Sequence, residues 1–267
     1  MLRSFIFALL LLLPVAANGN TVVSFDVGNR GGLPLAPTDT AGVVAVTNWN
    51  NLTGSSTTDS LLDAVDNSGT LTGIDISITN AEGVNWAGNT FHGQTPGSAN
   101  ARLLQDIAFE NGAGDTFNVT FDDIAFDNYD VYLYTGAKFE AWGGSISNGD
   151  TSYFIRGPVD NTAVTGFIQG TETGSFADAT SANYVKFSNL SGENQEFEFR
   201  VDAQQIYFAG AQIVSLDSVA TVPGFTAGSG ATIATAVPEP SSAIALLLIG
   251  AASVAVSYTH LTLPTKA

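Results

Sequence analysis

The sequence predicts an all-β fold, a single sandwich or jelly roll, for residues 18–219. Several segments in this range alternate apolar and polar residues, as strands with one buried face do. Charged residues make up only 12% of the chain, while 17 Phe, 7 Tyr and 28 Gly supply core rings and turns. Only residues 101–109 have the apolar spacing of a helix, with Asn100 placed to cap it. Strands without intervening helices favour a sandwich or jelly roll.

The clearest strand lies within residues 71–79, where Ile74, Ile76 and Ile78 alternate with polar residues. The Asn148-Gly149 pair predicts a two-residue hairpin turn of type I′, because that turn needs positive φ at both central positions. Further strands are expected at residues 21–27, 42–46, 117–121, 129–134, 151–155, 184–187, 197–201, 206–208 and 211–216.

The two flanks of this body have different compositions. Residues 1–17 predict a secretory signal peptide, in which Arg3 supplies the positive charge and residues 5–13 the apolar core. Small residues at 15–17 form the expected cleavage site. Residues 220–236 are rich in Gly, Ala, Thr and Ser and predict a flexible linker. The chain contains no cysteine, which excludes disulfides and cysteine-ligated metals.

A short motif follows the predicted linker. Val237, Pro238, Glu239 and Pro240 precede a run without charged residues that continues to residue 256. The prolines remove backbone donors and disfavour helix, so we expect the motif to be accessible to a processing enzyme. Motif and run resemble the sorting signal of bacterial PEP-CTERM proteins. The resemblance implies a C-terminal transmembrane helix, export through the inner membrane of a Gram-negative-type bacterium and cleavage by an exosortase-type enzyme. It also implies delivery to the cell surface or the exopolysaccharide matrix.

The apolar run over residues 243–256 is shorter than the roughly 20 residues that cross a bilayer. Residues 257–267 resemble the translation of a transposase-adapter sequence used to build sequencing libraries. We therefore expect residues 237–256 to be a sorting motif with a truncated membrane helix, and residues 257–267 to be non-native. The alternative is a genuine short polar tail on a weak anchor.

Three runs in the body are similar to a group of PEP-CTERM proteins of the Verrucomicrobia and Planctomycetes type that has no assigned activity. They are Asn-Trp-Asn-Asn-Leu at residues 48–52, Asn-Tyr-Asp-Val-Tyr-Leu-Tyr at 128–134 and Ala-Gly-Ala-Gln-Ile-Val at 209–214. This resemblance implies a jelly-roll body and adds no mechanism.

The charge of the chain limits its partners. Eight Lys and Arg stand against 25 Asp and Glu, which gives a net charge of −17. Such a surface repels nucleic acids and anionic membranes, so nucleic-acid binding is not expected. The body has one histidine, His92, too few for a Ser-His-Asp triad or a histidine-rich zinc site. We therefore do not expect an enzyme.

The densest acidic cluster holds Asp122, Asp123, Asp127 and Asp130. Their oxygens suit calcium, although the spacing does not match an EF-hand loop, and a solvated acidic turn is the simpler interpretation. Paired carboxylates also serve glycoside hydrolysis, which leaves a secreted polysaccharide-active hydrolase as the alternative function. Neighbours on a strand point to opposite faces, and this disfavours catalysis by the cluster itself.

Trp49, Trp86 and Trp142 each lie beside Asn or Gly. An exposed ring next to amide groups can stack on a sugar, so the three are candidates for glycan binding, while burial in the sandwich is the alternative. Taken with the sorting motif, the sequence predicts an exported surface or matrix protein with a structural or carbohydrate-binding body.

Overall fold

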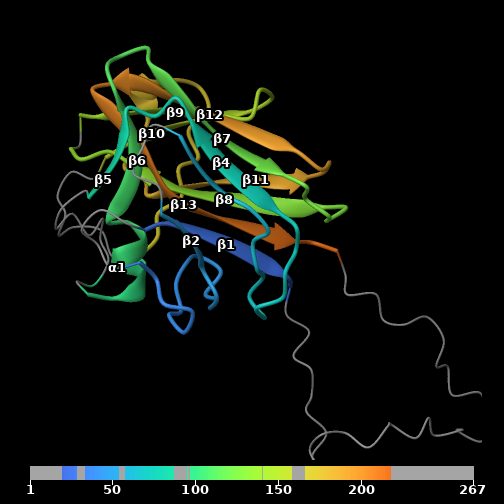
Figure 1. Cartoon of the computed structure of the whole chain (residues 1–267). Coiled ribbons are helices and arrows are strands. Elements are labelled where there is room, and N and C mark those ends of the chain that lie inside the picture. Colours follow the sequence, from blue (N-terminus) through green and yellow to red (C-terminus); the bar gives the residue numbers. More distant parts are fainter. Residues whose placement is uncertain are drawn as a thin grey trace, which may run out of the picture. The chain divides into compact units, whose positions relative to one another are not determined.

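The computed structural model describes residues 20–28, 34–53, 58–86, 95, 97–139, 141–157 and 166–217. Most of them lie in strands that form two sheets, and helix is almost absent (Figure 1). The all-β prediction is confirmed. The predicted leader, linker, sorting motif, truncated membrane helix, non-native tail and His92 lie outside the described residues. Within those residues, no helix is both long and apolar enough to cross a membrane.

The first sheet has seven strands in the order β11-β8-β13-β1-β2, with β6 joining β13 and β5 joining β6. All of its pairs are antiparallel except β1 with β2. The strands are β1 (Val22–Val27), β2 (Asn50–Leu52), β5 (Gly83–Trp86), β6 (Asp106–Asn111), β8 (Tyr129–Gly136), β11 (Tyr184–Leu190) and β13 (Gln205–Ser215).

The second sheet has six antiparallel strands in the order β10-β9-β12-β7-β4-β3. They are β3 (Asp59–Leu61), β4 (Asp75–Thr79), β7 (Thr116–Asp122), β9 (Gly143–Ser147), β10 (Ser152–Arg156) and β12 (Gln195–Ala203). The alternation predicted for β4, β7 and β12 is present, since every second residue is buried.

A hydrophobic core lies between the two sheets. It joins Phe25 of β1 and Phe208 of β13 with Phe117, Phe121 and Phe199 from the second sheet. The Phe117 and Phe199 rings stack with centroids 4.7 Å apart, and Phe121 lies 5.6 Å from Phe25. Aromatic rings bury more apolar area than any other side chains, so these contacts contribute strongly to holding the sheets face to face.

A second core covers the outer face of the first sheet. Leu35 and Trp49 from residues 34–49 pack there with Leu103, Leu104 and Tyr207. Both faces of β1 and most of β13 are therefore buried. This explains why β13 reads as a nearly continuous apolar run over residues 206–211, whereas β1 carries Ser24 and Asp26 as buried polar residues.

The predicted helix is wrong beyond its first turn. Helix α1 spans Ala99–Leu103, and the chain then enters β6 at Asp106. Its cap is Ser98, whose Oγ accepts the Ala101 N–H at 3.1 Å, whereas Asn100 Oδ1 accepts the Gly42 N–H. Apolar residues at helical spacing here serve a short helix and a buried strand in succession, because periodicity does not separate the two over so short a run. The structure also has one 3-10 turn, η1 (Phe176–Asp178).

Two other local predictions need correction. Residues 42–45 form a turn between bridged Ala41 and Val46, not a strand. The hairpin at Asn148-Gly149 is present between β9 and β10, but only Gly149 has positive φ, at 89°. The turn is therefore not type I′. Asn148 Oδ1 instead accepts the N–H groups of Asp150 and Thr151, which stabilises a longer loop.

Candidate functional site

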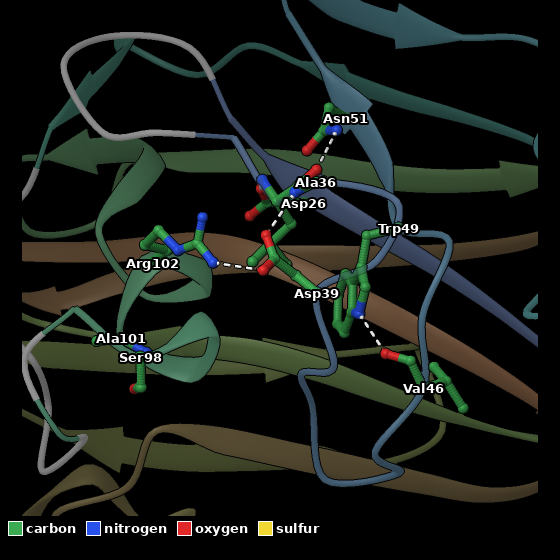
Figure 2. Close-up of polar contacts among 10 residues, drawn as sticks. Asp26, Ala36, Asp39, Val46, Trp49, Asn51, Ser98, Ala101 and Arg102 are labelled. Carbon is green, nitrogen blue, oxygen red and sulfur yellow. Dashed lines mark hydrogen bonds and ion pairs between the residues drawn. The ribbon is translucent and has the colours of Figure 1, made fainter.

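Trp49 is a core residue. It is 4% exposed, its ring lies 6.0 Å from that of Tyr134, and its indole N–H donates to the Val46 carbonyl at 3.1 Å (Figure 2). A ring in this position has no face open to a sugar. The structure therefore corrects the glycan-binding prediction at Trp49, because the layer of residues 34–49 needs a large apolar side chain to cover the first sheet.

Trp142 keeps a partly exposed ring in the β8–β9 loop. It meets Phe139 edge to face at 4.6 Å, and Phe139 is 51% exposed. The ammonium of Lys138 lies 5.4 Å from the Phe139 ring. Trp86 ends β5, and its side chain lies outside the described part of the structure. Trp142 thus remains a candidate sugar contact from the predicted set.

The four predicted calcium ligands are not brought together. Asp130 is buried, with Oδ2 2.7 Å from the Lys186 ammonium and Oδ1 accepting the Asn189 N–H. Asp123 is an exposed turn residue with φ 59°, and Asp127 is also exposed. No group of three or more His, Cys, Asp or Glu side chains in the described ranges can hold a metal ion. Calcium at Asp122, Asp123, Asp127 and Asp130 stays a prediction.

A group of aromatic and charged residues that the sequence did not single out lies on the outer face of β8 and β11. Tyr132 and Tyr184 stack with centroids 6.2 Å apart and planes inclined by 29°. Phe167 meets Tyr184 edge to face at 6.2 Å. The Lys186 ammonium lies 5.2 Å from the centre of the Tyr132 ring. We call Tyr132, Phe167, Tyr184 and Lys186 the aromatic face.

The strands explain why these residues meet. In β8, Val131 and Leu133 point into the core between the sheets, so Tyr132 points to the other side. In the β11–β8 pairing, Lys186 lies opposite Tyr132 and Tyr184 opposite Tyr134. Tyr132, Tyr184 and Lys186 are each partly exposed. Side chains at such positions are within contact distance and still reach solvent.

The charges of the aromatic face are well defined. Burial alone would lower the pKa of Lys186, but its hydrogen bonds to Asp130 and Tyr132 outweigh burial, and the pKa is raised. Burial raises the pKa of Tyr184, and the neighbouring Tyr132 adds to the effect. At neutral pH the face therefore presents the neutral Tyr184 phenol beside an ammonium group.

A second surface feature is an open hollow of about 320 Å³ on the outer face of the second sheet. It is lined by Asn118, Ser147, Asn148, Gly149, Glu196 and Glu198. These residues come from β7, β9 and β12 and from the β9–β10 turn, which are neighbours in the sheet (Figure 1). We call it the glutamate hollow.

A third polar group is buried under residues 34–39. Asp26 and Asn51 are directly paired across β1 and β2, and together they hold the Leu35 peptide. Asp26 Oδ2 accepts the Leu35 N–H at 3.2 Å, and Asn51 Nδ2 donates to the Leu35 carbonyl at 3.0 Å. Arg102 reaches from α1 to Asp39 at 2.7 Å (Figure 2). These contacts fix the loop that carries Leu35 onto the first sheet.

This buried group is not fully hydrogen-bonded. Asp26 Oδ1, Asn51 Oδ1 and Arg102 Nε have no hydrogen-bond partner within the described ranges. Burial raises the pKa of Asp26 well above its usual value, and the nearby Asp106 carboxyl raises it further. The Leu35 N–H and Arg102 act in the opposite direction. A neutral Asp26 carries a proton that it can donate, which makes its close packing against Asn51 less costly.

Comparisons with protein-family models and with curated proteins find no match to the chain.

Proposed function

We propose that the protein is an exported cell-surface or exopolysaccharide-matrix protein whose sandwich binds polysaccharide through the aromatic face. The observation that carries the proposal is the pair of partly exposed rings, Tyr132 and Tyr184, stacked 6.2 Å apart beside the Lys186 ammonium. Rings of this kind stack on the apolar faces of pyranose units. The ammonium and phenol groups then donate hydrogen bonds to sugar oxygens.

A binding role is favoured over hydrolysis by the state of the Asp130 carboxylate, which lies beside this face. Both Asp130 oxygens are already engaged, one by Lys186 and one by the Asn189 N–H. A glycosidase needs two carboxyl groups free to exchange protons or attack the sugar. For the hydrolase alternative, Glu196 and Glu198 of the glutamate hollow are a candidate pair of carboxyl groups. Release of reducing sugar from a bound polysaccharide would favour that alternative.

The proposal also includes the jelly-roll fold, the sugar contact at Trp142 and the sorting signal that the sequence predicts. The two-sheet body is a jelly roll, and Trp142 with Phe139 supplies an additional sugar contact at the β8–β9 loop. Delivery follows the PEP-CTERM resemblance: the C-terminal helix holds the chain in the membrane until an exosortase-type enzyme cuts near Pro238, Glu239 and Pro240. Replacing both prolines by alanine should leave the chain uncut when it is expressed with such an enzyme. Normal cutting of that variant would contradict the sorting proposal.

The proposal that the aromatic face binds polysaccharide is tested by passing the full chain over a panel of immobilised neutral polysaccharides. We expect retention on at least one of them, and loss of retention in Tyr132→Ala and Tyr184→Ala, since each variant removes one of the two stacked rings. Phe176→Ala is the matched control, because Phe176 is partly exposed and packs on Arg156 outside the aromatic face. Absence of retention on every polysaccharide, or equal loss in Phe176→Ala, would overturn the proposal.

A further inference from the structure

The chain contains three Asn-Gly pairs, at residues 18–19, 111–112 and 148–149, of which the last two lie in the described part of the structure. An Asn that precedes Gly can react with its own backbone, because glycine has no side chain to shield its peptide nitrogen from the Asn carboxamide. The groups that hold these atoms in the folded chain decide how fast the reaction runs. They differ between the two described pairs.

The Asn148 carboxamide is held in a position that favours attack. Its Oδ1 accepts the N–H groups of Asp150 at 3.2 Å and of Thr151 at 2.9 Å. These two bonds keep the carboxamide forward along the chain, toward the Gly149 nitrogen. They also stabilise the negative charge that develops on Oδ1 when its carbon is attacked, as the donors of an oxyanion hole do.

The Gly149 nitrogen is also well placed to react. Its N–H donates to Ser147 Oγ at 3.1 Å, so a hydroxyl oxygen lies within reach of the proton that must leave. Gly149 is exposed, with φ 89°, and a Cβ placed on it would meet no atom within 4 Å. The turn is therefore open both to the carboxamide and to water.

The Asn111-Gly112 pair is held in the opposite way. Asn111 Nδ2 donates to Glu82 at 2.5 Å, and its Oδ1 accepts the Gln205 side-chain amide at 2.9 Å. The Gly112 N–H donates to the Gln204 backbone carbonyl at 3.1 Å. Both reacting groups are thus bonded to other segments of the chain, and these bonds must open before the two can meet.

We propose that Asn148 is a self-modification site, where the folded turn promotes conversion of the amide to a carboxylate. The Gly149 nitrogen forms a bond to Asn148 Cγ as its proton passes to Ser147 Oγ, which releases a proton to solvent. Nδ2 takes up a proton from solvent and leaves as ammonia. One water then opens the five-membered imide. Opening at Cγ gives Asp, and opening at the backbone carbonyl gives isoaspartate, in which the chain continues through Cβ and Cγ.

The modification changes the glutamate hollow, which Asn148 lines together with Glu196 and Glu198. Either product adds a carboxylate to a surface that already carries two. Isoaspartate also adds one carbon to the backbone of the β9–β10 turn. The reaction needs only water, so older protein has a more acidic hollow than freshly made protein.

The test follows both asparagines in the full chain by peptide mass spectrometry during incubation at mildly alkaline pH, once folded and once in concentrated urea. In the folded chain we expect Asn148 to convert about ten-fold or more faster than Asn111, because the hydrogen bonds of Asn111 must first open. In urea the two should convert at similar rates. Asn148 should convert at least as fast in the folded chain as in urea.

Two variants sharpen the measurement. Ser147→Ala should slow conversion at Asn148 in the folded chain and leave its rate in urea unchanged, because the proton acceptor is positioned only by the fold. Asn148→Gln is the control, since a glutamine would have to close a six-membered ring and should stay intact over the same period. Thermal melting checks that both variants fold.

Three results would overturn the inference. They are equal rates at Asn148 and Asn111 in the folded chain, slower conversion of Asn148 in the folded chain than in urea, and the same mass gain in Asn148→Gln. An unchanged folded-state rate in Ser147→Ala would overturn the role of Ser147 as the proton acceptor.

Discussion

Asp26 is a carboxyl group whose ionisation opposes folding. It is buried, lies opposite Asn51 of β2, accepts the Leu35 N–H and is close to Asp106, and its pKa is raised in the folded protein. A raised pKa means that the folded state holds the proton more tightly than the unfolded chain does. The associated stability is complete below the ordinary Asp pKa, near 3.9, and is lost as pH rises toward the folded-state pKa.

The expected result is that Asp26→Asn becomes progressively more stable than the wild type as pH rises. Asn is neutral, keeps an oxygen for the Leu35 N–H and offers an N–H group toward Asn51. Within the titration window, the difference in free energy of unfolding should change by about 1.4 kcal/mol per pH unit. Urea unfolding of both proteins between about pH 3 and pH 8, which spans the ordinary carboxyl and histidine pKa values, measures it. A difference that stays constant with pH would contradict the raised pKa of Asp26.

Trp49 and the exposed Phe139 are expected to contribute very differently to the free energy of unfolding. Trp49→Ala should lower the free energy of unfolding by about 3–5 kcal/mol, because it leaves a large cavity against Tyr134. Phe139→Ala, at a ring that is 51% exposed, should change stability by no more than about 0.5 kcal/mol. Thermal or chemical unfolding compares the two. A small effect of Trp49→Ala would return Trp49 to the list of candidate binding residues.

At the scale of single elements, β9 depends on glycine. A Cβ placed on Gly144 would lie 1.9 Å from the Arg200 carbonyl oxygen of β12, so any side chain there forces the two strands apart. Gly144→Ala should therefore destabilise the fold by at least about 1–3 kcal/mol, the usual cost of overpacking. It should also disturb the glutamate hollow, to which β9 and β12 both contribute.

Gly83→Ala is the control for this element, because a Cβ there would meet only the Phe109 ring, at an ordinary 3.6 Å. Gly83 also lies in a strand, β5, so any general effect of replacing a strand glycine applies to both variants. Chemical unfolding of the two variants should separate them clearly. Equal stability would mean that β9 and β12 can shift apart without cost, contrary to their close backbone approach.

At the scale of the whole molecule, the acidic charge predicts how binding responds to salt. Raising the ionic strength from about 0.1 M to 1 M shortens the screening length from about 10 Å to 3 Å. Ring stacking on a neutral polysaccharide should not change, because it does not depend on charge. Affinity measured at both salt concentrations tests this. Loss of neutral binding at high salt would show that charge, not Tyr132 and Tyr184, holds the polymer.

The sequence was sufficient for the fold class because β4, β7 and β12 each have one face in the core and one in water. It was insufficient for residues 101–109, which were expected to form one helix, because periodicity does not separate a short helix from the buried start of β6. Residues 42–46 were expected to form a strand, and Trp49 was a candidate for glycan binding with burial as the alternative. Residues 42–45 form a turn and Trp49 is buried, which the sequence did not decide because Gly and Pro mark turns but do not tell whether a turn is covered.

Most of the candidate site could not be predicted from the sequence, because its residues become neighbours only through strand pairing. Tyr132 and Asp130 could be placed on one face of their strand, but Tyr184 and Lys186 lie far along the chain and become neighbours only through the β11–β8 pairing. The glutamate hollow likewise needs β12 to lie between β7 and β9. Strand order is set by the packing of the whole core, which no local pattern contains.

The central claim is that the aromatic face binds polysaccharide, and one comparison tests it most directly. The measurement is affinity electrophoresis of the full chain in a gel that contains a polysaccharide to which the wild type binds. The double variant Tyr132→Ala with Tyr184→Ala should no longer be retarded. The double variant Tyr132→Phe with Tyr184→Phe should be retarded nearly as much as the wild type, because it keeps both rings. Retardation of the alanine pair equal to that of the wild type would contradict the claim.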